Sequence, residues 1–308
     1  MKRMDVYTPS QVLNGENPAP ISQYNLQFLA QGDSWFSTGA VPPSFTTNLF
    51  DGMGTSTIGA CAVNCAQPGA HLSLMVDSTR DRQFMAFLNG VQSRRWAGLL
   101  LSGGGNDMIA AAQQPPTNTP GLRLFATSSE WTQALGAERY LSNAGWQTFC
   151  VHITQVFNEL LVARDSGENR GMPVVMHSYD VASPRNVGAG FGFGPWLYPA
   201  MIAYNIPQQD WLPVAQVLLD RLQTLLDHIA ANTPDGSVHV VHGQGTLTPA
   251  LPTDVEATAD WENEIHPTPQ GYRQLSALWQ PMLDAVFVAS IASTDTGGYP
   301  SAEGGLAL

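Results

Sequence analysis

The sequence is poor in charged residues and in cysteine. Only 12% of its 308 residues are charged, and Lys2 is the one lysine. With 13 basic residues against 25 acidic ones the formal net charge is −12, a field that repels phosphate backbones and argues against nucleic-acid binding. Cys61, Cys65 and Cys150 have neither the even number of a disulfide framework nor the spacing of a zinc site. We expect them to be small apolar core residues.

Long apolar runs are also missing. The polar start of the chain contains no signal-peptide h-region, and no uninterrupted apolar run is long enough to cross a bilayer. We therefore expect a cytoplasmic protein without a membrane span, with signal-independent export as the alternative. No group of His, Cys and Asp residues has a persuasive ligand spacing, so we expect neither a metal nor a cofactor.

The apolar residues alternate between strand-like and helix-like patterns. Continuous apolar runs predict five strands, at 25–31, 57–64, 96–102, 172–177 and 238–242. Helix-spaced apolar residues predict helices at 79–94, 146–165, 209–232 and 269–288. Continuous apolar strands suit a parallel sheet covered on both faces. The alternation therefore predicts right-handed βαβ units in a three-layer α/β/α sandwich.

The other segments predict an arm, one domain and a tail. Residues 1–24 are polar and Pro-rich, and we expect them to form an N-terminal arm on the surface. The domain itself is predicted to span 25–290. The Gly- and Ser-containing residues 291–308 predict a flexible tail.

Two long segments interrupt the strand–helix rhythm of the domain and predict insertions, near 110–139 and 183–208. The second contains Phe191 and Trp196 among several glycines. Aromatic side chains among glycines favour an ordered lid or pocket wall. Packing against the outside of the sheet is the alternative.

A Gly-Asp-Ser-Trp segment follows the first predicted strand. It places Ser34 at the carboxyl end of that strand, where reactive groups of open α/β sheets collect. A serine hydroxyl needs a base, and the imidazole of His266, just before a predicted helix, has an ordinary pKa that suits this task. A helix N-cap is the alternative for Ser34, and a surface loop for His266. Asp33 and Trp35 flank the serine and are expected beside the pocket.

Two more segments that follow strands offer donors to a negatively charged oxygen. Asn106 follows the third strand in a Gly-rich loop, whose glycines allow a substrate to approach closely. Gly69 follows the second strand and offers its backbone N–H. Together with the Ser34 N–H they predict an oxyanion hole, in which one donor is typically worth about 10²–10³ in rate. Phosphate binding is the alternative for the Gly-rich loop, but no Gly-Lys-Ser/Thr sequence follows.

In their order along the chain, these blocks resemble those of the SGNH, or GDSL, hydrolase superfamily. The blocks are Gly32-Asp33-Ser34, Asn64 with Gly69 five residues later, Gly104-Gly105-Asn106-Asp107 and His266-Pro267. The resemblance implies a flavodoxin-like α/β/α sandwich around a mainly parallel five-stranded sheet. It also implies ester hydrolysis through an acyl-enzyme, with Ser34 as nucleophile and His266 as base. The oxyanion hole it implies consists of the Ser34 and Gly69 N–H groups and the Asn106 side chain.

The sequence departs from this family three residues before the histidine, where the family usually has an aspartate. The residue here is Asn263. An asparagine can orient the imidazole through its carbonyl oxygen but supplies no charge to stabilise the imidazolium. Two alternatives remain open. Glu262 or Glu264 reaches the ring instead, or Asp180, which follows the fourth strand, does so.

These residues favour a carboxylic ester hydrolase that acts on small-molecule esters with short- to medium-chain acyl groups. His177 and Asp180 end the fourth strand and are further candidates for the pocket. Acyl transfer to an alcohol or a sugar is a second possible activity. A binding module that has kept the scaffold and lost catalysis is a third, favoured by the missing aspartate. The sequence leaves the oligomeric state open.

Overall fold

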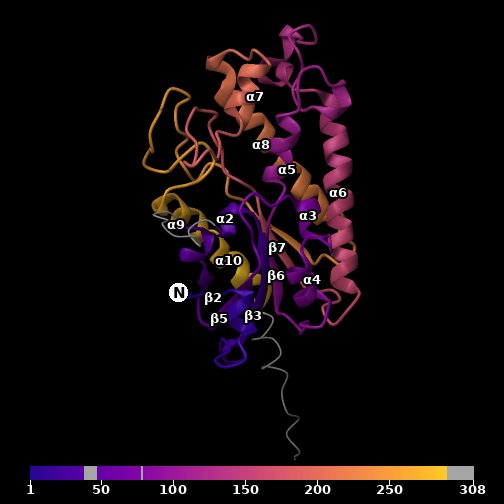
Figure 1. Ribbon diagram of the computed structural model, residues 1–308, viewed down its shortest axis with the longest axis vertical. Helices are drawn as coiled ribbons and strands as arrows, with labels where there is room; N and C mark the ends of the chain where they lie inside the picture. Colours follow the sequence, from indigo (N-terminus) through magenta and orange to yellow (C-terminus); the bar gives the residue numbers. More distant parts are fainter. Residues whose placement is uncertain (38–46, 78, 290–308) are drawn as a thin grey trace, which may run out of the picture.

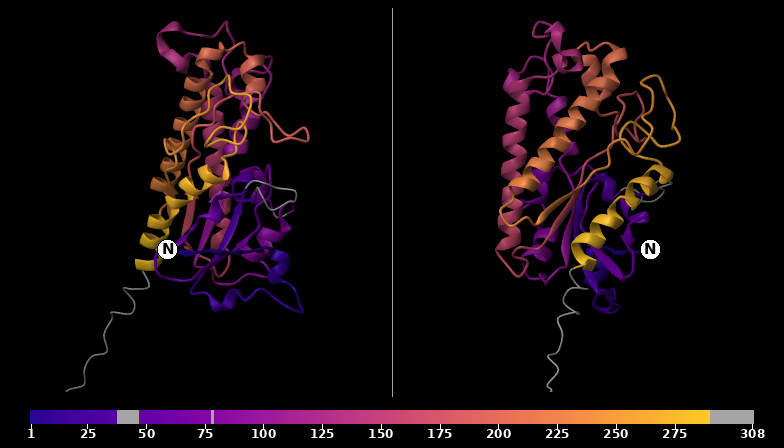
Figure 2. Two further views of the ribbon diagram at one scale, coloured as in Figure 1. Left: turned by 90° about the vertical axis from the view of Figure 1, so that its left-hand side faces the viewer. Right: turned by 180° about the vertical axis from the view of Figure 1, so that it is seen from behind.

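A computed structural model describes residues 1–37, 47–77 and 79–289. Its central feature is a six-stranded sheet in the order β2-β5-β3-β6-β7-β8, in which each neighbouring pair is parallel. Figures 1 and 2 show helices on both sides of the sheet, with α6 on one side and α9 and α10 on the other. The protein is therefore a three-layer α/β/α sandwich, as predicted. The predicted tail at 291–308 lies outside the described residues.

The sheet has one strand more than the five predicted. The five predicted strands are β3 (Leu26–Gly32), β5 (Ala60–Asn64), β6 (Gly98–Ser102), β7 (Val174–His177) and β8 (Val238–Val241). The sixth, β2 (Asp5–Tyr7), lies within the segment predicted to be a surface arm and pairs with β5. Its three residues are too few to show an apolar run. β1 (Lys2–Arg3) and β4 (Gly54–Thr55) form a separate antiparallel pair.

The longest helices lie where the helical spacing predicts them. They are α6 (Asn143–Asp165) and α8 (Trp211–Asn232). The region 269–288, predicted as one helix, is divided into α9 (Pro269–Ala277), α10 (Trp279–Leu283) and the π-helix η6 (Asp284–Val288). Within the described ranges, no helix is long and apolar enough to cross a membrane.

The other helices are short. α4 (Arg82–Leu88) fills only part of the predicted 79–94, and the Asp81 side chain caps its start by accepting from the Phe84 N–H. The remaining α-helices are α1 (Pro9–Val12), α2 (Ser34–Ser37), α3 (Leu72–Met75), α5 (Gly105–Ala112) and α7 (Tyr198–Ala203). The 3₁₀ helices are η1 (Ile21–Gln23), η2 (Leu49–Asp51), η3 (Pro120–Leu122), η4 (Gln133–Tyr140) and η5 (Gln208–Asp210).

The C-terminal helices pack closely on the sheet. A Cβ built at Gly98, the first residue of β6, would lie 2.5 Å from the Phe287 ring, so only glycine fits there. The Phe287 ring in turn packs edge-on against Phe28 of β3, with 4.9 Å between ring centroids. This packing fixes the position of the chain that follows the loop containing His266.

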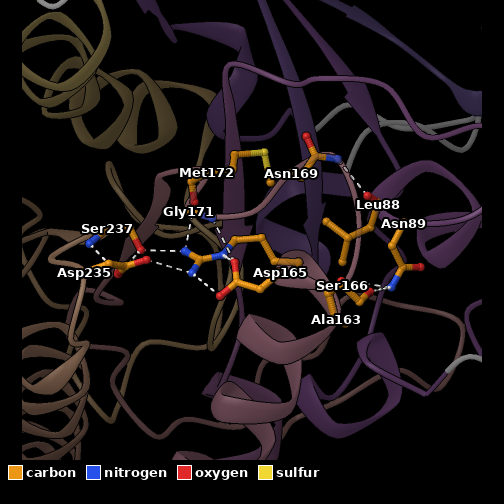
Figure 3. A network of polar contacts seen from close by, with 11 residues as sticks. Leu88, Asn89, Ala163, Asp165, Ser166, Asn169, Gly171, Met172, Asp235 and Ser237 are labelled. Carbon is orange, nitrogen blue, oxygen red and sulfur yellow. Dashed lines mark hydrogen bonds and ion pairs between the residues drawn. The ribbon is translucent and has the colours of Figure 1, made fainter.

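A buried arginine joins α6 to the segments just before two strands of the sheet, and Figure 3 labels its partners Asp165, Met172, Asp235 and Ser237. Arg164 is 1% exposed and forms ion pairs with Asp165 at 2.7 Å and Asp235 at 3.0 Å. It also donates to the Met172 carbonyl and to Ser237 Oγ, just before β7 and β8 begin. A buried charge is tolerated when it is paired in this way, and the network holds the end of the sheet opposite to Ser34.

Candidate active site

The structure brings together two residues that lie far apart in sequence, Ser34 and His266. Ser34 directly follows the end of β3 and begins α2, and His266 lies in the loop before α9. Ser34 Oγ is 2.9 Å from His266 Nε2. The side chains are nearly buried, at 8% and 6% exposure, so the alternative of a surface-loop histidine is wrong. The hydroxyl is within reach of a base that can accept its proton.

Asn263 fixes the tautomer of that base. Its Oδ1 is 3.0 Å from His266 Nδ1, and it also accepts the backbone N–H groups of Ile265 at 3.1 Å and His266 at 3.0 Å. Two N–H donors identify this atom as the amide oxygen rather than the nitrogen. Nδ1 must therefore carry the proton, and the lone pair of Nε2 faces the Ser34 hydroxyl. This is the tautomer that a general base requires.

The other candidates for this position have different partners. Asp180 accepts the N–H groups of Val181, Gly245 and Leu247, at 2.7–2.8 Å. Glu264 also binds backbone groups, and Glu262 makes no contact with the imidazole among the described residues. The alternatives in which a carboxylate orients His266 are therefore not seen.

Glu264 instead connects the loop containing His266 to the predicted pocket wall. Its carboxylate accepts backbone N–H groups from Arg185 at 3.2 Å, Leu197 at 3.0 Å, Tyr198 at 2.7 Å and, in addition, Trp196. Burial raises the pKa of Glu264 to about 7, although these N–H groups favour the charged form. The side chain thus holds the start of α7 beside His266.

Two tryptophans pack around the Ser34–His266 pair. Trp196 lies edge-to-face with the His266 imidazole, at 5.1 Å between ring centroids. Trp35 Nε1 donates to the Ile265 carbonyl at 3.2 Å. Burial lowers the pKa of His266 to about 4, so its imidazole is neutral at neutral pH.

Asn106 and the Gly69 loop lie next to each other. The Asn106 side chain, in the first turn of α5, donates from Nδ2 to the Ala70 carbonyl at 3.1 Å. The loop before Gly69 is held at the end of β3, because Gln67 N–H donates to the Gly32 carbonyl at 2.9 Å. Gly69 has φ +75°, which favours glycine at this position. Among the described residues, Ala70 is the one hydrogen-bond partner of the Asn106 amide, whose second hydrogen is thus available to a ligand.

A small cavity opens between Ser34 and Asn106. It is partly open and has a volume of about 30 Å³, room for about two water-sized groups. Its lining combines a few polar side chains with a larger number of apolar ones. The lining residues are Asp33, Ser34, Trp35, Gly105, Asn106, Met108, Ile109, Tyr179, Asp180, Ala182, Leu197, Leu219 and Ile265.

Three residues predicted to line the pocket do not line this cavity. His177 is 3% exposed and stacks on Trp35, with 5.4 Å between ring centroids. Trp196 covers His266 rather than the cavity. The prediction for Phe191 is wrong, because its side chain is 95% exposed. Asp33, Trp35 and Asp180 line the cavity.

A buried hydrogen-bonded chain that the sequence analysis missed lies beneath the nucleophile. Tyr179 OH contacts Asp33 Oδ2 at 2.5 Å, and Ser102 Oγ contacts Asp33 Oδ1 at 2.8 Å. Ser102 Oγ is also 2.9 Å from His177 Nε2, and His177 Nδ1 is 3.1 Å from the Ser178 carbonyl. Ser102 and Tyr179 end or follow strands, as Ser34 does, and that position was the available signal.

For all four contacts of this hydrogen-bonded chain to be hydrogen bonds at once, one proton more is needed than its neutral donors supply. Four contacts require four hydrogens, whereas neutral Tyr179, Ser102 and His177 provide three. Below about pH 6 a proton on Asp33 supplies the fourth hydrogen. Above that pH Asp33 is mainly ionised, and Ser102 Oγ donates to Asp33 Oδ1 instead of to His177. Burial favours the proton on Asp33, since it raises the pKa of Asp33 to about 6 and lowers that of His177 to about 4.

In the part of the chain that the structure describes, no group of three His, Cys, Asp or Glu side chains is arranged to hold a metal ion.

No protein-family model matches this chain, and no curated protein matches it in sequence. Several solved hydrolase structures resemble it. An extracellular lipase from Streptomyces rimosus is 14% identical, with a TM-score of 0.46, over 85% of this chain and 99% of the lipase. A protein from Slackia heliotrinireducens, proposed to be an SGNH hydrolase, is 13% identical, with a TM-score of 0.44, over 82% and 96%.

Phospholipase A1 from Streptomyces albidoflavus NA297 is 17% identical, with a TM-score of 0.43, over 84% of this chain and 98% of the phospholipase. Structures described as a proposed SGNH hydrolase and a proposed GDSL-like lipase are thus among those that this chain resembles. All three TM-scores are below 0.5. Neither the fold class given above nor the chemistry of the site depends on these likenesses.

Proposed function

We propose that this protein is a serine esterase that cleaves carboxylic esters of small molecules through an acyl-enzyme. The observation that carries this proposal is the 2.9 Å contact of Ser34 Oγ with His266 Nε2, together with the tautomer that Asn263 imposes. A hydroxyl and an unprotonated imidazole nitrogen in this arrangement are the parts of an activated nucleophile. The adjacent amide of Asn106 supports the assignment, because acyl transfer needs a donor for the developing oxyanion.

In the first half of the reaction, Ser34 Oγ attacks the carbonyl carbon of the ester while His266 Nε2 takes the hydroxyl proton. The carbonyl oxygen becomes an oxyanion, which the Asn106 amide and the N–H groups of Ser34 and Gly69 bind. Collapse of the tetrahedral intermediate breaks the bond to the alkoxy group. That group leaves as an alcohol after it takes the proton from the imidazolium.

In the second half, His266 Nε2 removes a proton from water, and the resulting hydroxide attacks the acyl-enzyme carbonyl. The same donors bind the second oxyanion. Collapse then returns the proton to Ser34 Oγ and releases the carboxylic acid. Asn263 orients the imidazole through both halves but adds no charge to stabilise the imidazolium.

The cavity favours a short acyl group. Its volume of about 30 Å³ suits an acetyl-sized group, and a medium-length chain would extend beyond its open side. Acyl transfer to an alcohol is the second candidate activity, because the 8% and 6% exposure of Ser34 and His266 restricts the access of water to the acyl-enzyme. Product analysis in the presence of added alcohol separates the two activities.

The experiment that tests the proposal is labelling with a fluorophosphonate probe. The wild type should be labelled, and Ser34→Ala should not. Ser37→Ala is the matched control, because Ser37 is a buried serine of the same helix whose hydroxyl bonds only to the Asp33 carbonyl among the described residues. Labelling that persists in Ser34→Ala would refute the role of Ser34. Aryl esters of rising acyl length then measure the depth of the cavity.

A further inference from the structure

A small hairpin exposes two phenylalanines to solvent. We call residues 188–194 the aromatic hairpin. Its turn is closed by the Phe193 N–H, which donates to the Gly190 carbonyl at 2.9 Å, and by the Ala189 N–H, which donates to the Phe193 carbonyl at 2.8 Å. The side chains of Phe191 and Phe193 are 95% and 69% exposed. Figure 2 (left) shows this hairpin projecting from the body of the protein.

The stability of the fold does not explain why a phenylalanine occupies the tip of this hairpin. Phe191 has φ +52°, a left-handed conformation that residues with side chains rarely adopt, and it lies between Gly190 at +83° and Gly192 at +81°. An asparagine or a glycine would suit this turn better. Because the ring is almost fully exposed, it gains little from packing within the fold. A strained, exposed aromatic residue points to a role outside the folded chain.

The chain around the hairpin carries no charge. Residues 186–209 contain no Asp, Glu, Lys or Arg, although the whole chain has 25 acidic residues. Ile202, on α7 within the same stretch, is 53% exposed. The hairpin can therefore enter an apolar medium without the cost of desolvating a charged side chain.

The hairpin is also continuous with the candidate active site. It leads through Pro195 into Trp196, which packs against the His266 imidazole, and then into Leu197, which lines the cavity. Glu264 holds the backbone of both residues. A ligand or a surface that binds the hairpin would therefore lie close to the Ser34–His266 pair.

We propose that the aromatic hairpin inserts Phe191 and Phe193 into the surface of a neutral lipid aggregate, from which the esterase takes its ester. A lipid surface suits the hairpin better than a protein does, because two side chains offer far less area than the roughly 800 Å² per partner of a stable protein interface. The net charge of −12 opposes binding to anionic lipid, which selects zwitterionic or uncharged lipid. The substrate part of this inference rests on the proposed function.

Sedimentation with phosphatidylcholine vesicles tests the binding. The wild type should sediment with the vesicles, and the double variant Phe191→Ser/Phe193→Ser should lower the partition coefficient about tenfold or more. Val91→Ser is the matched control, because Val91 is 93% exposed but lies in the turn after α4, distant in sequence from the hairpin. The control should bind as the wild type does. Raised salt should not weaken binding, because no charge attraction is involved.

Three results would overturn the inference: no binding of the wild type to these vesicles, an equal loss of binding in Val91→Ser, or binding to anionic vesicles alone. Hydrolysis of a water-soluble aryl ester, measured in parallel, should be unchanged in the double variant. If the wild type fails to hydrolyse that ester but binds vesicles through the phenylalanines, the proposed esterase activity fails and the lipid contact stands.

Discussion

Asn263 Oδ1 accepts three N–H groups, including His266 Nδ1 at 3.0 Å, and so occupies the place of the carboxylate in a Ser-His-Asp arrangement. All three contacts require only an acceptor. A carboxylate would make the same contacts and would in addition stabilise the imidazolium. Asn263 thus orients the His266 imidazole but brings no negative charge to it.

Replacement of Asn263 by Asp should therefore keep or raise the esterase activity. The added negative charge favours protonated His266, and the acid limb of the kcat/KM–pH profile should move upward from about 4 toward the ordinary value of 6.5. Asn263→Ala is the contrasting variant. It removes the acceptor that fixes the tautomer and should lower kcat/KM by about 10²-fold. Circular dichroism checks that both variants fold, and a folded but inactive Asn263→Asp protein would contradict this account.

The wild type should stay active in mildly acidic solution. Only neutral His266 can accept the serine proton, and burial holds its pKa at about 4 rather than the ordinary 6.5. With an ester that does not ionise, kcat/KM should rise as the pH rises through about 4 and level off above about 5. The unfolded chain binds this proton at higher pH than the folded one does. The contribution of His266 to stability therefore decreases as the pH falls from 6.5 to about 4. An acid limb near 6.5 would exclude the buried, neutral base.

Removal of the amide donor should slow the chemistry without weakening substrate binding. Asn106→Ala deletes the amide that we propose as a donor to the oxyanion, and kcat should fall by about 10²–10³-fold while KM changes little. Asn118→Ala is the control, because Asn118 bonds to Gln114 in the segment after α5 rather than to the Gly69 loop. A rise in KM with unchanged kcat would mean that Asn106 binds the substrate but not the transition state.

The sequence predicts the strands well because a parallel sheet buried on both faces requires continuous apolar runs, as in β3 and β6. It misses β2, since three residues carry no such pattern. Ser34 and Asn106 were predicted as site residues because each lies within a few residues of the end of a strand, and strand ends meet at one edge of the sheet. The pocket prediction for Phe191 was wrong, because an aromatic residue between glycines does not reveal which way the loop turns.

The sequence could not predict the backbone partners of Glu264 either. Its carboxylate lies two residues from His266 in sequence, which suggested the imidazole as its partner. Its actual partners are N–H groups at the start of α7, about 66–68 residues away, and Arg185. Such contacts depend on how two loops fold against each other, which no local pattern contains.

NMR should detect the additional proton of the hydrogen-bonded chain that lies buried beneath Ser34. At pH 5, His177 should be neutral with its proton on Nδ1, and Nε2 should accept a hydrogen bond from Ser102. As the pH rises through about 6, Asp33 should lose its proton, and the ¹⁵N signal of Nε2 should shift as that hydrogen bond is lost. Ser102→Ala breaks the chain and should make this signal insensitive to the pH step. An imidazolium at pH 5 in the wild type would show that the proton resides on His177 instead.

Glu264→Gln should separate the pocket wall from the loop that contains His266. A glutamine turns an NH₂ group toward backbone N–H donors, and the unfolding free energy should fall by roughly 1–3 kcal/mol. Trp196 and Leu197 would shift, and kcat/KM should fall roughly tenfold or more, since a displacement of about 1 Å can cost about 10²-fold. Glu262→Gln is the matched control: it removes the same charge two residues away, from a side chain that accepts none of these N–H groups among the described residues.

The stability deficit of Glu264→Gln should also depend on pH. The pKa of Glu264 is raised from 4.5 to about 7 in the fold, so the folded protein binds this proton more tightly than the unfolded chain does. Its contribution to stability is therefore fully present below about 4.5 and is lost as the pH rises through about 7. The difference in unfolding free energy between wild type and variant, measured by urea denaturation, should be largest at pH 4 and shrink toward pH 8. A difference that grows over this range would mean that the four N–H groups outweigh burial and hold the carboxylate ionised.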